Sequence, residues 1–136
     1  MNDINLMNKA ADNIRILAAS MVEKAKSGHP GGAMGGADFV NVLFSEFLVY
    51  DPKNPAWEGR DRYFQDPGHM SPMLYSVLAL TGKFTIDELK EFRQWGSVTP
   101  GHPEVNVMRG IENTSGPLGQ GHTYAVGAAI AAKFLK

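Results

Sequence analysis

The chain has 136 residues, a formal net charge of −1 and no cysteine. Its hydrophobic content of 43% and charged content of 20% are those of an ordinary globular domain, which excludes disorder and predicts one domain. The balanced charge argues against a nucleic-acid-binding surface, and the lack of thiols excludes disulfides, zinc–thiolate sites and a cysteine nucleophile. No apolar stretch is long enough to cross a membrane, and the N-terminus is not a secretory signal. These features indicate a cytoplasmic protein with no membrane or nucleic-acid partner.

Helical periodicity dominates the first third of the chain. Apolar residues recur at three- and four-residue steps over residues 4–26, which predicts a helix. This helix is expected to end at 27–30, because glycine and proline stop it there. Residues 31–36 are rich in glycine and are predicted to form a turn. A second helical pattern covers residues 39–48, and two prolines predict a loop at 51–55.

The middle of the chain contains the one predicted strand. Residues 62–65 are Arg-Tyr-Phe-Gln, flanked by turn residues. Helical spacing over residues 70–78 predicts a third helix, which ends near Gly82. Thr85 and Glu88 have the spacing of a capping box that opens a short helix. The inward-facing residues of that helix are predicted to be Leu89, Phe92 and Trp95.

A long loop and a helix are predicted for the C-terminal part. Residues 96–117 are irregular, and a loop of this length in a compact domain is usually functional. The helix from Leu118 carries small residues that permit close packing, and its pattern continues to residue 136 without a stop signal. This end is either a frayed terminal helix or the point at which a longer protein has been cut. In the second case, part of the apolar surface is expected to face water: Phe39, Leu43, Phe47, Leu74, Val77 and residues 125–132.

Every histidine follows a glycine, at 28–29, 68–69, 101–102 and 121–122. Glycine makes up only 15 of the 136 residues, so chance would rarely produce this arrangement. The first three pairs lie in predicted turns, where glycine allows close approach to a ligand and histidine can exchange a proton near neutral pH. Their wide spacing matches no short zinc motif. No metal ligand is therefore predicted in this chain, although folding could still gather distant histidines around a metal.

A second candidate is the glycine-rich segment 114–121, which leads into the last predicted helix. The free N–H groups of a helix N-terminus favour an anion or a polar ligand. The segment is neither a dinucleotide-binding fingerprint nor a P-loop, because no Gly-Lys-Ser/Thr follows. The alternative is a plain helix cap with tight packing.

Five segments of the chain form a recognisable set. They are Lys-Ser-Gly-His-Pro-Gly at 26–31, Arg-Asp-Arg-Tyr-Phe at 60–64, Gly-His at 68–69, Thr-Pro-Gly-His-Pro-Glu at 99–104 and Gly-Pro-Leu-Gly-Gln-Gly at 116–121. Together, in this order, they resemble transketolase. The resemblance covers essentially the whole chain and corresponds to the beginning of that enzyme. It implies that residues 1–136 are an incomplete N-terminal diphosphate-binding domain. The implied fold class is α/β, mostly helical in this portion, with about one short strand.

The resemblance also implies an activity. Transketolases transfer a two-carbon ketol unit from a ketose phosphate to an aldose phosphate in the pentose phosphate pathway, using thiamine diphosphate and a divalent metal such as Mg. His29 and His102 are implied to bind the donor sugar and to act as catalytic residues. The implied cofactor-binding residues are His69, Gly116, Pro117 and Leu118. The resemblance places residues 116–118 at the ring end of the cofactor, whereas the helix N-terminus alone favours its phosphate end.

The chain departs from the family pattern in two ways. Asp-Pro-Gly-His at 66–69 stands where many members have Ser-Asn-Gly-His, which makes the contact of His69 with the cofactor less secure. The family's Gly-Asp-Gly motif and its downstream Asn, which hold metal and diphosphate, are not in this sequence. The metal ligands are therefore expected beyond this chain, and the chain by itself is expected to be inactive.

The resemblance also implies an oligomeric state, and two alternatives to a transketolase fragment stay open. The active site of the family forms between two subunits, so a homodimer is implied for the whole enzyme. One alternative is a fragment of another thiamine diphosphate enzyme, such as a deoxyxylulose-phosphate synthase or a dihydroxyacetone synthase. The other is a non-catalytic interaction module that reuses this half-domain.

Overall fold

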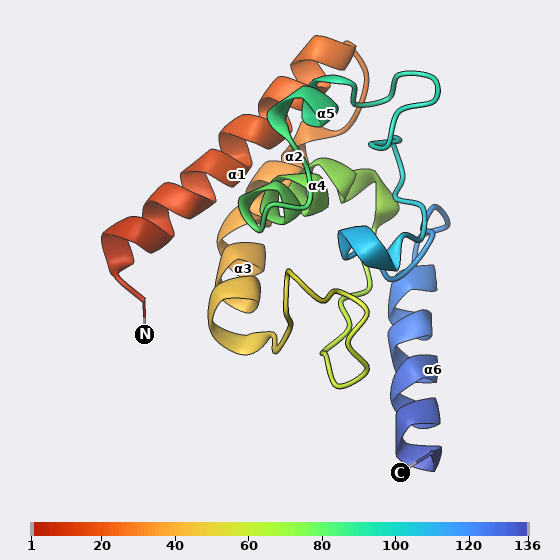
Figure 1. Ribbon diagram of the computed structural model, residues 1–136. Coiled ribbons are helices and arrows are strands. Elements are labelled where there is room, and N and C mark those ends of the chain that lie inside the picture. Colours follow the sequence, from red (N-terminus) through yellow and green to blue (C-terminus); the bar gives the residue numbers. More distant parts are fainter. Residues whose placement is uncertain (1, 136) are drawn as a thin grey trace.

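Helices joined by loops make up residues 2–135, the part of the chain that the computed structural model describes (Figure 1). Within these residues there is no strand, and the only β-type pairing is an isolated bridge between Asn106 and Ile111. The prediction of a mostly helical chain is therefore confirmed. In chain order the elements are α1 (Ile4–Ala25), α2 (Pro30–Gly35), α3 (Ala37–Val42), the π-helical turn η1 (Leu43–Phe47), the 3₁₀ turn η2 (Gly68–Met70), α4 (Ser71–Leu80), α5 (Ile86–Lys90), the 3₁₀ turn η3 (Val107–Arg109) and α6 (Gln120–Phe134).

Helix α1 begins where its periodicity predicts and ends at Ala25, one residue earlier than predicted. Asp3 caps it, since its carboxylate accepts hydrogen bonds from the backbone N–H groups of Asn5 and Leu6 at 2.8 and 3.0 Å. At the other end Lys26 adopts a left-handed conformation with φ of 50°, which stops the helix. One face of α1 is buried, at Ala11, Ile14, Ala18 and Met21.

Helix α4 lies at the centre of the packing. Every residue from Ser71 to Leu78 is buried, because α1, α2, α3 and α5 all pack against this helix. The predicted exposure of Leu74 and Val77 is therefore wrong, since neighbouring helices cover them in place of a sheet. The core that forms around α4 contains Ile14, Met21, Val40, Phe44, Leu74, Tyr75, Leu78, Phe84, Leu89, Phe92 and Ile111.

The glycine-rich stretch 31–36 is largely helical, which corrects the predicted turn. Pro30 begins α2, where its fixed φ suits the first helical position and its missing N–H costs nothing. The glycines serve close packing. A Cβ at Gly36 would lie 2.6 Å from the sulfur of Met73, and a Cβ at Gly32 would lie 3.0 Å from that of Met70. The glycines that suggested a turn instead allow this segment to contact Met70 and Met73 closely.

Residues 62–65 form no strand, so that prediction is wrong. Their backbone is bonded to a side chain and not to a neighbouring strand. Asn113 accepts the N–H of Gln65 at 2.9 Å and donates to its carbonyl at 3.2 Å. A strand needs a partner strand for its backbone groups, and residues 2–135 supply none here.

Helix α5 begins at the predicted capping box and is shorter than its apolar spacing suggests. Leu89 and Phe92 are buried as predicted, but Trp95 is fully exposed. The helix ends at Lys90, and Arg93 then takes a φ of 62°, which turns the chain before Trp95 is reached. The helical spacing of the apolar residues is therefore interrupted before Trp95.

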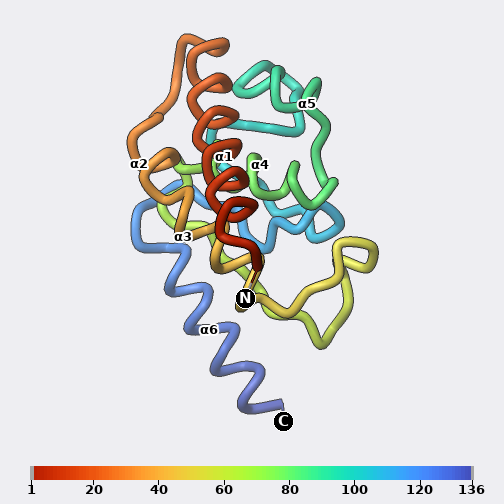
Figure 2. The backbone as a smooth tube through the Cα atoms, turned by 90° about the vertical axis from the view of Figure 1, so that its left-hand side faces the viewer, coloured from red at the N-terminus to blue at the C-terminus, as the bar shows by residue number. Residues whose placement is uncertain are grey.

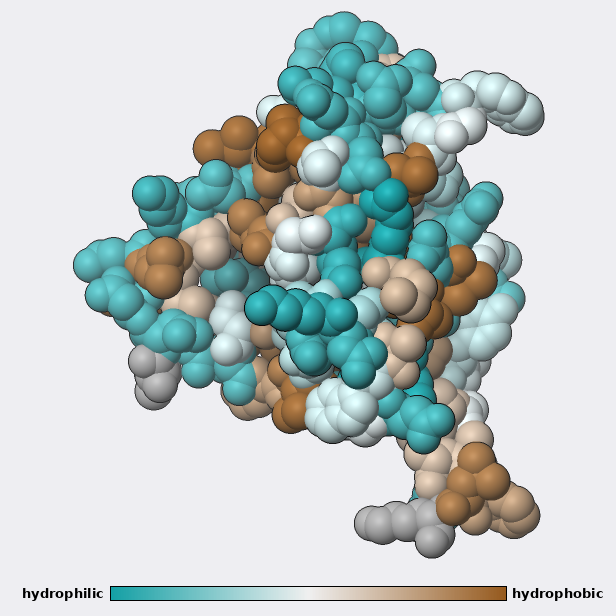
Figure 3. Space-filling model, viewed as in Figure 1, coloured by the Kyte–Doolittle hydropathy of each residue, from teal (hydrophilic) through white to brown (hydrophobic). Residues whose placement is uncertain are grey.

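Helix α6 projects from the rest of the structure, and its far end is apolar (Figures 1, 2 and 3). Phe134 and Leu135 are 87% and 82% exposed. Phe39 and Phe47 are 64% and 70% exposed, in agreement with their predicted exposure. Of the small residues expected to pack closely in α6, Gly121 alone is buried within residues 2–135. None of the helices in the described part is both long and apolar enough to cross a membrane.

Glu88 connects α5 to the long loop that follows it. Its carboxylate accepts a hydrogen bond from Arg109 at 2.7 Å and completes the capping box by accepting the N–H of Thr85 at 2.8 Å. The hydrogen bond from Arg109, followed by that from Thr85, lowers the pKa of Glu88 from 4.5 to about 2. The charged form of Glu88 is therefore favoured in the folded state.

This shift predicts a pH dependence of stability. A carboxylate with a depressed folded pKa contributes stability above its unfolded pKa of 4.5 and loses it as the pH falls towards 2. Glu88→Gln is expected to lower the free energy of unfolding at neutral pH by roughly 1.5–3 kcal/mol and to flatten its decline between these pH values. Urea unfolding across this range measures both effects. Glu58→Gln, at an exposed position, is the control, and equal pH dependence in both variants would contradict the prediction.

Candidate functional site

Three of the four histidines come together from separate loops. The rings of His29 and His69 are 4.6 Å apart between centroids. His102 lies against the same turn, since a Cβ at Gly68 would be 3.0 Å from its Cδ2 atom. His122 is not part of this cluster, because its Nδ1 atom pairs with Asp66 at 2.8 Å. The structure thus gathers the three histidines of the predicted turns and separates the fourth.

Buried hydroxyl groups of α4 hold the loop that carries His102. Ser71 Oγ donates to the carbonyl of Gly101 at 2.7 Å, and Tyr75 Oη donates to that of Pro100 at 2.8 Å. Ser71 follows η2, which contains His69. The beginning of α4 therefore sets the position of both imidazoles.

The loop is also anchored on its other side. Thr99 is fully buried and donates its hydroxyl to the carbonyl of Glu88 in α5 at 3.0 Å. The carbonyl of Pro103 accepts the N–H of Ser115 at 3.0 Å. Residues 99–103 are thereby bonded to α4, α5 and the 113–119 segment, although they have no regular secondary structure.

The environment of His102 favours its neutral form. Partial burial, and then the positive charge of Arg93 and the neighbouring imidazoles of His69 and His29, lower the pKa of His102 below 6.5. At neutral pH its imidazole is uncharged and can accept a proton. An open recess of about 710 Å³ adjoins it, lined by Ser27, Arg93, Gly101, His102 and Glu104 among others. His102 is the one histidine among the residues that line this recess.

Residues Gly116, Pro117 and Leu118 lie next to the turn of His69. Pro117 and Leu118 are exposed, and a Cβ at Gly116 would meet nothing within 4 Å, so the backbone is open to a ligand. Nearby, Ser115 Oγ is buried and finds no hydrogen-bond partner within residues 2–135. It faces Gly68, where a Cβ would lie 2.9 Å from it.

The N-terminus of α6 already holds an anion of the chain. Asp66, whose side chain is 8% exposed, accepts the N–H of Gly119 at 3.0 Å and pairs with His122. Gly119 itself has a φ of 89°, and α6 begins at Gln120, two residues later than its sequence pattern indicates. The favourable position for an anion at this helix end is therefore occupied by the Asp66 carboxylate.

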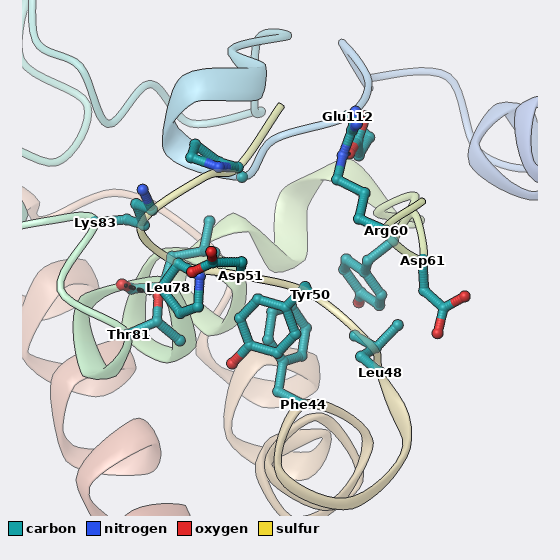
Figure 4. A pocket seen from close by; sticks show the side chains of 14 residues that line it. Phe44, Leu48, Tyr50, Asp51, Arg60, Asp61, Leu78, Thr81, Lys83 and Glu112 are labelled. Carbon is teal, nitrogen blue, oxygen red and sulfur yellow. Dashed lines mark hydrogen bonds and ion pairs between the residues drawn. The ribbon is translucent and has the colours of Figure 1, made fainter. Parts of the chain in front are cut away.

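A second recess is separate from the histidines and too small for a cofactor (Figure 4). It has a volume of about 40 Å³ and is bordered by Phe44, Tyr50 and Tyr63. At its edge Arg60 donates to Glu112 through two bonds of 2.7 and 3.0 Å, with both side chains 9% exposed. This buried pair joins the 49–66 segment to the segment that leads to Ser115.

Sequence reasoning missed the polar residues that hold these loops together. Arg60 lies within a motif that the resemblance uses, but its partner Glu112 is far away in sequence. Asp66 and His122 are separated by more than fifty residues, and only the packing of α6 brings them together. Within residues 2–135, no group of three or more His, Asp or Glu side chains could hold a metal ion.

Comparison with known proteins identifies the family. A sequence profile described as "Transketolase, thiamine diphosphate binding domain" matches residues 6–136. The chain therefore belongs to the thiamine diphosphate-binding domain family of transketolases. It is 54% identical over 131 residues to a transketolase of Buchnera aphidicola subsp. Baizongia pistaciae, covering 96% of this chain and 20% of that protein. It is also 54% identical over 126 residues to transketolase 1 of Escherichia coli, covering 92% of this chain and 19% of that protein.

Solved transketolase structures contain the same arrangement of helices. The crystal structure from Campylobacter jejuni superposes with a TM-score of 0.91 at 49% identity, covering 97% of this chain and 21% of that one. The transketolase of Pichia stipitis in complex with sedoheptulose 7-phosphate gives a TM-score of 0.87 at 45% identity, covering 92% and 18%. The chain spans about a fifth of the length of the relatives it matches.

Substituting alanine for Gly121 or for Gly127 in α6 is expected to change the free energy of unfolding in opposite directions. A Cβ at Gly121 would lie 2.6 Å from the carbonyl oxygen of Gln65 and would clash with Cβ of Asp66, whereas one at Gly127 would meet nothing within 4 Å. Gly121→Ala is expected to destabilise the chain by about 1–3 kcal/mol through overpacking. Gly127→Ala is expected to stabilise it by roughly 0.5–1 kcal/mol, because alanine is the better helix former. Chemical denaturation measures both, and changes of the same sign would contradict the contact at Gly121.

Proposed function

We propose that residues 1–136 are the N-terminal part of the diphosphate-binding domain of a longer transketolase. The enzyme transfers a two-carbon ketol unit from a ketose phosphate to an aldose phosphate in the pentose phosphate pathway. It acts as a homodimer and uses a divalent metal such as Mg, whose ligands lie outside this chain. The family match supports this proposal, as do Pichia stipitis transketolase complexes with sedoheptulose 7-phosphate and fructose 6-phosphate. The observation that carries it is the gathering of three imidazoles on anchored loops.

The residues beside His69 fit thiamine diphosphate. Ser115 Oγ is a buried polar atom without a partner in the described part of the chain, and the neighbouring backbone is open at Gly116. His69 and the backbone of 116–118 would hold the cofactor. Because Asp66 supplies an anion at the start of α6, this helix end suits the uncharged part of the cofactor better than its diphosphate. When bound, thiamine diphosphate supplies the carbon nucleophile and electron sink that ketol transfer requires.

His29 and His102 would move protons on the sugar. A ketol transfer must remove a proton from one sugar hydroxyl and return one later, and imidazole can do both near neutral pH. His102 is suited to accept a proton, because its lowered pKa keeps it neutral. Its loop is fixed by hydrogen bonds to α4, α5 and Ser115, so the imidazole needs little reorganisation before the reaction.

Substitution of the histidines in the full-length protein tests these roles. His29→Ala and His102→Ala are each expected to lower kcat/KM for xylulose 5-phosphate by about 10²–10⁴-fold, with cofactor affinity little changed. His69→Ala is expected to weaken cofactor affinity most. Glu58→Ala, at an exposed position outside the cluster, is the control.

The assay is ketol transfer to ribose 5-phosphate with thiamine diphosphate and Mg. Loss of cofactor affinity in the His29 and His102 variants, with turnover retained at saturating cofactor, would contradict their assignment. A full-length wild-type protein without ketol transfer would overturn the proposed function and favour a non-catalytic module.

A further inference from the structure

Arg93 occupies a special position between two of the histidine loops. Its backbone has a φ of 62°, a left-handed conformation that is unfavourable for a residue with a side chain. Its N–H donates to the carbonyl of Thr99 at 3.0 Å, so the conformation is held by the loop that carries His102. A strained backbone of this kind persists only where the surrounding structure imposes it.

The guanidinium group contacts both loops at once. Its Nη1 atom donates to Ser27 Oγ at 3.1 Å, two residues before His29. A Cβ at Gly101 would lie 2.8, 2.9 and 3.1 Å from the Nε, Cζ and Nη2 atoms of Arg93. These similar distances mean that the guanidinium plane lies flat over Gly101, immediately before His102. Any side chain at position 101 would push it away.

The positive charge of Arg93 is not neutralised by its acidic neighbours in sequence. Glu88 pairs with Arg109, and Glu91 pairs with Lys24. The Nε atom of Arg93 is buried and has no acceptor within the described residues. The charged and titratable groups around His102 are Arg93, His69 and His29, while Glu104 lines the same recess. Arg93 is therefore the permanent cation of the histidine cluster.

We propose that Arg93 is a positioning residue, whose flat guanidinium ties the His29 loop to the His102 loop and so sets the separation of the two imidazoles. It acts on the two imidazoles through Ser27 and Gly101. This inference rests on the proposed function, because it assigns His29 and His102 to one reaction. The bridge also explains why an unfavourable backbone conformation is retained at this position.

Two variants separate the bridge from the charge. Lysine keeps the positive charge but lacks the planar fork that can lie on Gly101 while bonding Ser27. Arg93→Lys in the full-length protein is expected to lower kcat by about 10- to 100-fold with little change in the pKa of His102. Arg93→Gln is expected to lower kcat similarly and also to raise the pKa of His102, because a nearby positive charge is removed. Arg62→Gln, at an exposed arginine, is the control for both measurements.

Two measurements read out these effects. NMR titration of labelled histidine gives the pKa of His102, and the pH profile of kcat/KM gives its kinetic counterpart. Unchanged kcat per folded enzyme in both variants, with only a lower Tm, would overturn the proposal, since Arg93 would then be merely structural. Full activity in Arg93→Lys would also overturn it, because charge alone would suffice. If the wild-type protein lacks ketol transfer, the proposed function fails. In that case the pKa of His102 still tests the position of Arg93. An unchanged pKa in Arg93→Gln would contradict the proposed position of Arg93 beside His102.

Discussion

The burial of α4 is the constraint on which the rest of the structure depends. From Ser71 to Leu78 this helix has no face in water, so the hydroxyl groups it carries must find acceptors inside the protein. Ser71 and Tyr75 find them in the carbonyls of Gly101 and Pro100. The same bonds that make the burial of α4 possible therefore fix the loop of His102 beside the turn of His69.

Polar contacts between side chains and loops hold together segments that no sheet connects within residues 2–135. Asn113 bonds the backbone of Gln65, and the buried pair of Arg60 and Glu112 joins the same two segments. Burying an ion pair costs solvation, and the pair persists here with two well-formed hydrogen bonds. The ion pair therefore fixes the position of the backbone that leads to Ser115. The candidate site is thus built on irregular backbone whose position is nevertheless determined.

Two charged side chains, one acidic and one basic, shape the electrostatics of the candidate site. Asp66 provides the negative charge at the start of α6, and Arg93 provides a positive charge beside His102. The carboxylate occupies the helix end that would otherwise favour an external anion, while burial and then the guanidinium of Arg93 lower the pKa of His102. Each group also connects two loops, so electrostatics and positioning depend on the same side chains.

Much of the local structure could be predicted from the sequence. Periodicity located α1, α4 and α6, the capping box located the start of α5, and the Gly-His pairs marked the loops that carry the candidate residues. These features depend on neighbours within one or two helical turns.

Tertiary structure alone decided that His29, His69 and His102 meet while His122 pairs with Asp66. It also decided that residues 31–36 are helical, that 62–65 lack a strand partner and that Arg93 lies on Gly101. The physical reason is that these contacts join groups far apart in the sequence. Burial of the helices determines which of these groups meet. No local pattern encodes that outcome.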